Sequence, residues 1–157
     1  MLDMNEKIAK KIGEAYAFSI VLKELKVKTS DVFIELFGDD SKNVLEVSSM
    51  QIKSLEELSK EFSMKDTVIT KAEKTSKKIT EMGEFYVGND WDDSAEVLEW
   101  MSFFLGAAIV HWQLILGAAK KMNNKEFELI CNDGVDYYSQ LLNKAKLKAE
   151  EIGAERV

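Results

Sequence analysis

The chain has 157 residues, of which 46% are hydrophobic and 31% are charged, and these values are typical of one globular domain rather than of a disordered segment. Its net charge of −7 disfavours contact with phosphate backbones, so nucleic acid is not an expected partner. Proline is absent and glycine occurs only eight times, so the turn signals of a many-stranded sheet are missing and an all-α fold is expected.

The spacing of apolar residues predicts four long helices and two lesser ones. They cover residues 5–27, 31–37, 41–62, 66–84, 93–121 and 124–152. Asn5 is the predicted N-cap of the first helix, and Asp93 with Glu96 forms a capping box at the start of the fifth. Short connections between the helices predict a single-domain antiparallel four-helix bundle over residues 1–157, with 31–37 and 66–84 as additional short or weaker helices.

The segment WMSFFLGAAIVHWQLILGAA, residues 100–119, contains no charged side chain and is long enough to cross a membrane. Because it carries Ser102, His111 and Gln113, and because no second segment of this kind occurs, we expect the buried centre of a bundle and no membrane contact. This interpretation makes 95–121 the most buried helix.

Within that helix, LGAA at 105–108 recurs at 116–119. Eleven residues of α-helix make roughly three whole turns, so the two small patches face the same way. Glycine and alanine in register allow another backbone to approach closely, and the repeat therefore predicts a tight helix–helix contact.

His111 is the only histidine of the chain, and as a buried neutral ring it needs a hydrogen-bond partner. The candidate carboxylates on other helices are Glu14, Asp133 and Asp136. An apolar pocket beside the histidine is a second hypothesis, with aromatic lining residues from the same helix: Phe103, Phe104 and Trp112.

EAYAF at 14–18 resembles the first helix of ferritin-like and rubrerythrin-like bundles, and MQIKSLEEL at 50–58 is similar to the end of their second helix. The resemblance implies a four-helix bundle and, in members with a di-iron site, a Glu from each of two helices and a Glu-x-x-His from each of the other two. Of those ligands only Glu14 has a match. Ala108 stands where a Glu-x-x-His motif ending at His111 would need Glu, and the second-helix positions are Ser48 and Gln51.

We therefore expect no cofactor and no bound metal; the residues that would form a metal site, if there is one, are Glu14, His111, Asp133 and Asp136. The layout of the whole chain is also similar to a small archaeal family of unknown function with four long and two short helices. That similarity implies a fold and no activity.

One cysteine, Cys131, cannot close a disulfide within the chain, and MLDMNEKIAKK lacks the basic-then-apolar order of a signal peptide, so a cytoplasmic protein is expected. The preferred function is a non-catalytic protein-interaction or structural module. The alternative is a ferritin-like bundle that binds a metal or a small apolar ligand near Glu14 and His111. The interaction module predicts a large exposed apolar patch, and the ligand-binding bundle predicts a closed cavity on the order of several hundred Å³.

The short helix DVFIELF, residues 31–37, concentrates five large apolar side chains in seven positions. Some of that surface should remain exposed after the monomer folds, and a two-fold homodimer is the commonest way to cover such a patch. We expect a homodimer, with this helix near the interface or packed across the open end of the bundle. Another protein is also a possible partner.

Overall fold

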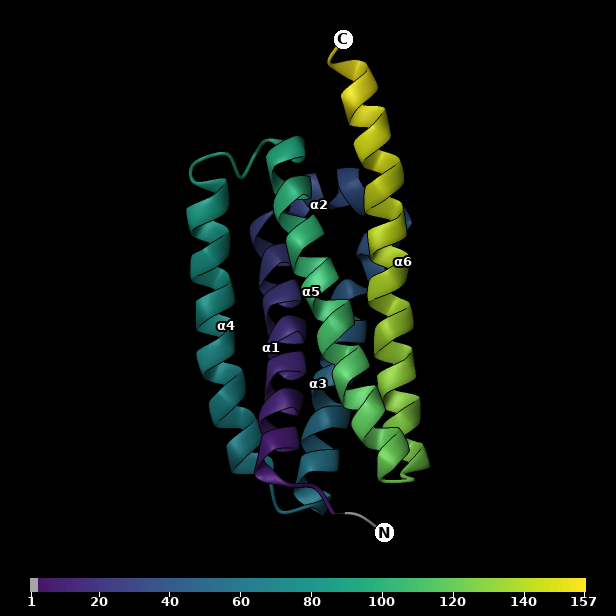
Figure 1. The fold of residues 1–157 in the computed structure, drawn as a ribbon. Helices are drawn as coiled ribbons and strands as arrows, with labels where there is room; N and C mark the ends of the chain where they lie inside the picture. Colours follow the sequence, from purple (N-terminus) through teal and green to yellow (C-terminus); the bar gives the residue numbers. More distant parts are fainter. Residues whose placement is uncertain (1–2) are drawn as a thin grey trace.

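The computed structural model describes residues 3–157, and within them all regular structure is helical (Figure 1). The all-α prediction is confirmed. The elements in chain order are α1 (Glu6–Lys28), α2 (Ser30–Phe37), the 3₁₀ helix η1 (Gly38–Asn43), α3 (Val44–Glu61), α4 (Lys65–Val87), α5 (Ser94–Lys121) and α6 (Lys125–Glu155).

Three of the long helices begin at side-chain caps. The Asn5 side chain accepts a hydrogen bond from the Ile8 backbone N–H at 3.0 Å, Asp93 accepts one from Ala95 at 2.9 Å, and Asn124 accepts one from Phe127 at 3.0 Å. Each cap satisfies a backbone donor that the first helical turn leaves free. The predicted starts of α1 and α5 are therefore confirmed.

The middle of the chain differs from the prediction. The expected single helix over 41–62 begins as 3₁₀ helix η1 and becomes α-helical only at Val44. The expected weak helix over 66–84 extends from Lys65 to Val87 and equals α1 in length, at 23 residues. It continues past 84 until Gly88, whose φ of +63° is a left-handed conformation that glycine adopts without strain.

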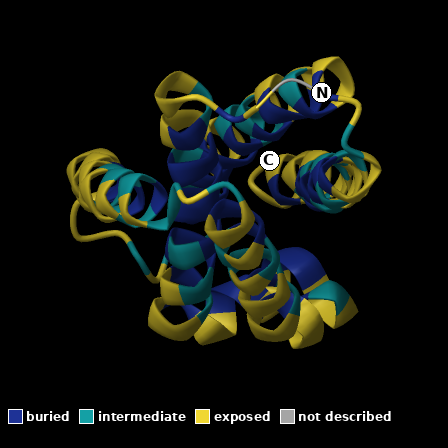
Figure 2. Ribbon diagram, turned by 90° about the horizontal axis from the view of Figure 1, so that it is seen from below, coloured by how far each residue is buried: buried dark blue, intermediate teal, exposed yellow. Residues whose placement is uncertain are grey.

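Helix α1 lies at the centre of the molecule and packs against α3, α4 and α5. The five consecutive residues Ala15–Ser19 are all buried, and because successive side chains differ by about 100°, they cover the whole circumference of the helix. The prediction that 95–121 is the most buried helix is wrong. Seen along the helices, the buried residues gather in the middle of the molecule and the exposed ones form its outer surface (Figure 2).

Helix α5 is buried on one side only. It packs on α1 and α6, whereas Phe103, Val110 and Leu114 on its opposite side are 59%, 58% and 51% exposed. By length and composition α5 could cross a membrane, with a mean hydropathy of 1.6 over its most apolar window, of which 39% is buried inside the fold. In this structure it is a half-buried helix with an uncovered apolar face.

The glycines of the LGAA repeat do not form the expected tight contact, whereas its alanines Ala108 and Ala119 are both 0% exposed inside the fold. No atom of another part of the described chain lies within 4 Å of a Cβ built on Gly106 or Gly117, because both face solvent. The close approach occurs elsewhere, where Gly134 of α6 makes room for the indole of Trp112.

Helix α2 is part of the core. Phe33 and Phe37 are 0% and 1% exposed, their ring centroids are 4.7 Å apart, and the helix packs on α1, α5 and α6. Of the five large apolar side chains of DVFIELF only Ile34 is exposed, at 49%. The exposed apolar patch expected on this helix is therefore absent from the fold, and the helix packs against the rest of the bundle.

Candidate functional site: the groove between α4 and α5

Helix α4 packs mainly along α1, so a groove remains between α4 and α5. Its volume is about 260 Å³. The α5 wall is mostly apolar, whereas the α4 wall combines Ile79 and Met82 with polar and charged side chains. The lining residues are Glu14, Phe18, Lys71, Thr75, Lys78, Ile79, Met82, Trp100, Phe103, Phe104, Ala107 and His111.

The charged end is built around Glu14. Its carboxylate lies 3.2 Å from His111 Nε2, 3.1 Å from Lys11 Nζ and 3.7 Å from Lys71 Nζ. Three basic side chains therefore surround one half-buried carboxylate, which satisfies a charge that would otherwise be costly to bury. The neighbouring Lys78 forms no ion pair within residues 3–157, so this end of the groove carries more positive than negative charge.

Both ring nitrogens of His111 face acceptors. Nδ1 lies 2.7 Å from the Ala107 carbonyl oxygen one turn earlier in α5, and Nε2 faces Glu14. A neutral imidazole has one N–H and an imidazolium has two, so two acceptors, a carbonyl and an ionised carboxylate, are both satisfied only by a ring with two N–H groups. The ring also packs against Phe18, with centroids 5.0 Å apart. His111 is thus fixed from three directions.

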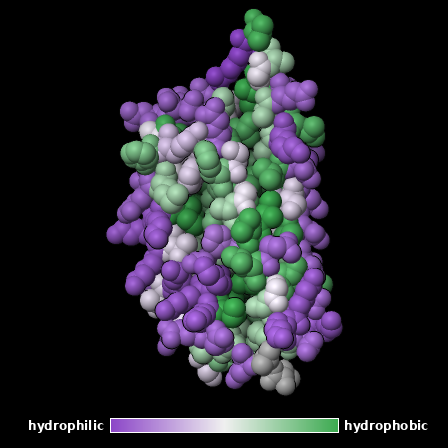
Figure 3. All heavy atoms as spheres, viewed as in Figure 1, coloured by the Kyte–Doolittle hydropathy of each residue, from purple (hydrophilic) through white to green (hydrophobic). Residues whose placement is uncertain are grey.

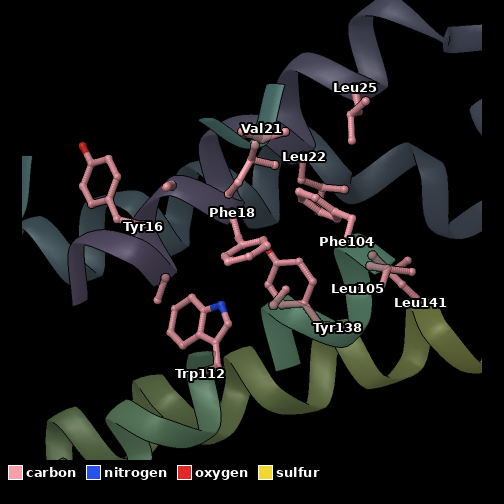
Figure 4. Close-up of a cluster of buried hydrophobic side chains, with 14 of the residues drawn as sticks. Tyr16, Phe18, Val21, Leu22, Leu25, Phe104, Leu105, Trp112, Tyr138 and Leu141 are labelled. Carbon is pink, nitrogen blue, oxygen red and sulfur yellow. The ribbon is translucent and has the colours of Figure 1, made fainter. Parts of the chain in front are cut away.

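Three of the four residues predicted to line a pocket do line this groove: His111, Phe103 and Phe104. The fourth, Trp112, does not. Its side chain is fully buried and points into the core, where Figure 4 shows its indole beside Phe18 and Tyr138. The next residue along a helix is rotated by about 100°, so adjacent residues such as His111 and Trp112 face different neighbours. The placement of Trp112 in the pocket is therefore wrong.

The structure brings Glu14 to His111 but does not bring the other two candidate carboxylates to them. Asp133 lines a separate pocket between α3 and α6, and Asp136 is exposed on α6. Across residues 3–157 no group of three or more His, Cys, Asp or Glu side chains is arranged to hold a metal ion. The carboxylate partner of His111 is thus decided in favour of Glu14.

A polar cluster lies inside the core where α1, α3 and α6 meet. Gln51 Oε1 accepts hydrogen bonds from Ser19 Oγ at 2.8 Å and from the Tyr138 hydroxyl at 3.5 Å. Gln51 and Ser48 are the polar residues that interrupt the apolar stripe of α3 in the sequence. Gln51 therefore has a structural role in joining three helices, whereas the buried Ser48 hydroxyl has no partner within residues 3–157.

We expect the free energy of unfolding to fall at alkaline pH through the buried Tyr138 and the partly buried Tyr137. Burial raises the pKa of Tyr138, and likewise of Tyr137, above the ordinary value of 10.0. The folded protein then keeps protons that the unfolded chain releases, so this contribution is complete below about pH 10 and is lost as the pH rises above it. Urea midpoints at about pH 9 and pH 11 measure the loss, and Tyr137→Phe with Tyr138→Phe should reduce it. An equal loss in the variant would assign it to other groups.

Sequence reasoning missed the aromatic and aliphatic residues at the end of α4. Met82, Phe85 and Tyr86 are 54%, 92% and 42% exposed. Tyr86 contacts Phe103 of α5, with ring centroids 5.3 Å apart. Met82 and Phe103 both line the groove. The helical spacing 82, 85, 86 was an available signal, because it places the three side chains on one side of a helix. The helix predicted here ends at 84, so it includes Met82 near its end and leaves out Phe85 and Tyr86.

Together with the exposed side of α5, these residues form one surface, which we name the open face. Space-filling Figure 3 shows hydrophobic side chains through the middle of this side of the molecule, with hydrophilic ones on both flanks. Its large apolar residues are Met82, Phe85, Tyr86, Phe103, Val110 and Leu114.

Comparison of the chain with protein-family models, with curated proteins and with solved structures gives no significant match.

Proposed function

We propose that this protein is a non-catalytic, cytoplasmic protein-interaction module and that the open face is its contact surface. In this proposal α1, α3, α5 and α6 form an antiparallel four-helix bundle, with α4 added against α1 and α2 packed on α1, α5 and α6. The chain order and the neighbours of each helix support this architecture, since α1 packs on α3 and α5, and α6 packs on α5 and α3.

The observation that carries the proposal is the exposure of six large apolar side chains on adjoining sides of two helices, between 42% and 92% of each side chain. Scattered single apolar residues are normal on a protein surface, but a contiguous patch of this kind marks a contact with another molecule. The aromatic members favour a protein contact, because aromatic side chains and Met are enriched at protein interfaces.

The alternative of a small ligand in the core has less support. It predicts a closed cavity beside His111 and Trp112, whereas the groove is bordered by Met82 and Phe103, which are more than half exposed, and Trp112 lies outside it. The thiol of Cys131 is fully buried, and burial raises its pKa, so it is not an available nucleophile.

The test is a photo-crosslinking amino acid placed at Val110 in the chain as expressed in its source cells, with Leu147 as the control position. Both side chains are exposed, at 58% and 71%, but Leu147 lies on α6 outside the open face. We expect a crosslinked product of discrete mass from position 110 and none from 147. Equal labelling at both positions, no product at 110, or recovery of the chain with membranes and no protein crosslink would contradict the proposal.

A further inference from the structure

The exposed side of α5 has a symmetric pattern along its length. A row of seven positions runs along this side, 99, 103, 106, 110, 114, 117 and 121, of which Gly106 is half-buried and the other six are exposed; the exposed residues 102, 113 and 120 flank it. The steps within the row are four, three, four, four, three and four residues. The pattern therefore reads the same in both directions from Val110. An isologous two-fold contact needs this symmetry. If residue i of one chain contacts residue j of the other, then residue j of the first chain must contact residue i of the second.

Antiparallel pairing about Val110 matches large residues with small ones. Phe103 of one chain would face Gly117 of the other, and Leu114 would face Gly106, with each pair occurring twice. Phe103 and Leu114 are 59% and 51% exposed, while no side chain of residues 3–157 lies within 4 Å of a Cβ built on either glycine. Side chains of one helix would thus fill the hollows of the other, as close helix packing requires.

The same pairing matches opposite charges. Glu99 of one chain would face Lys121 of the other at both ends of the contact. Both residues are exposed, and neither takes part in an ion pair within residues 3–157. Glu99 precedes the uncharged run 100–119 and Lys120 and Lys121 follow it, so the pairing brings opposite charges together although each chain carries a net charge of −7. Such rim charges fix the register of an interface.

From these observations we infer that the partner of the open face is a second copy of this chain, bound through antiparallel α5 helices with a two-fold axis at Val110. This inference rests on the proposed function and names the partner for the same surface. The contact runs from residue 99 to residue 121, a length of about 33 Å at 1.5 Å per residue. Met82, Phe85 and Tyr86 beside it supply the further apolar area that a stable dimer needs.

The experiment measures dimer dissociation by sedimentation equilibrium for the full chain and a set of charge variants. Glu99→Lys or Lys121→Glu alone puts like charges together at both ends, and we expect the dissociation constant to rise by about tenfold. The double variant exchanges the two charges, so it should return to within about threefold of the wild type. Gly117→Leu should weaken the dimer without unfolding the monomer, because its side chain fills the hollow meant for Phe103.

Disulfide formation gives an independent readout of the axis. Val110→Cys should form an intermolecular disulfide under mild oxidation, because identical residues at a two-fold axis face each other. Val27→Cys is the matched control, since Val27 is 70% exposed and lies on α1, outside the open face. The native Cys131 is buried and should not interfere.

Three results would overturn the inference. The first is a monomer at high micromolar concentration. The second is a dimer whose dissociation constant is the same in the wild type and in every variant. The third is a double charge variant whose dissociation constant is no lower than those of the single variants. Failure of the dimer and failure of the interaction function remain distinguishable. A discrete photo-crosslink from position 110 at a mass other than twice that of the chain would leave the function standing and remove the self-partner.

Discussion

Gly134→Ala should destabilise the protein by about 3 kcal/mol, the upper part of the range for overpacked cores. A Cβ at this position would overlap the Trp112 indole, far inside any contact that real side chains make. Trp112 is fully buried between α1 and α6 and cannot move away without displacing its own neighbours. Chemical denaturation followed by circular dichroism measures the change.

The control is Gly153→Ala in the same helix. Within residues 3–157, apart from the nearby backbone of α6 itself, no atom lies within 4 Å of a Cβ at Gly153, so the substitution should be neutral or stabilising by up to about 1 kcal/mol, the helix-propensity difference between glycine and alanine. If both variants had equal stability, the close approach of α5 and α6 at Gly134 would be incorrect.

Phe33→Ala should cost about 4 kcal/mol in the free energy of unfolding, as expected for removing a buried aromatic ring. Phe33 is 0% exposed and packs against Phe37 and beneath the ammonium of Lys26, which lies 5.7 Å from its ring centroid. The dimer dissociation constant, measured where the variant is still folded, should not change.

Ile34→Ala is the matched control for that variant. Ile34 is the next residue of the same short helix, but it is 49% exposed, so its truncation should cost less than about 1 kcal/mol. If Phe33→Ala strongly weakened the dimer with little loss of stability, α2 would form part of the dimer interface, and the placement of Phe33 in the core would be incorrect.

The sequence determined the secondary structure of this protein to a large extent. Helical periodicity, the absence of proline and the cap residues Asn5 and Asp93 are local signals, and each acts within one or two turns of chain. The ends of α1 and α5 therefore follow from the sequence alone. The pairing of His111 with a carboxylate also followed, because a half-buried imidazole needs partners, although three carboxylates satisfied that requirement equally.

Tertiary structure decided which helix is central and which side of α5 is covered. A run without charge is compatible with a helix that is buried on all sides or on one side only. Hydropathy indicates that a side chain can be buried, but it does not indicate which neighbouring helix packs on it. α1 is surrounded by three helices because α4 packs along it, and the same placement leaves α5 uncovered on the side of Phe103 and Val110. Likewise, Gly134 receives Trp112 while Gly106 and Gly117 face solvent. These glycines have the same intrinsic backbone preference and differ in which side chains pack against them. The packing partners depend on the tertiary structure of the whole chain.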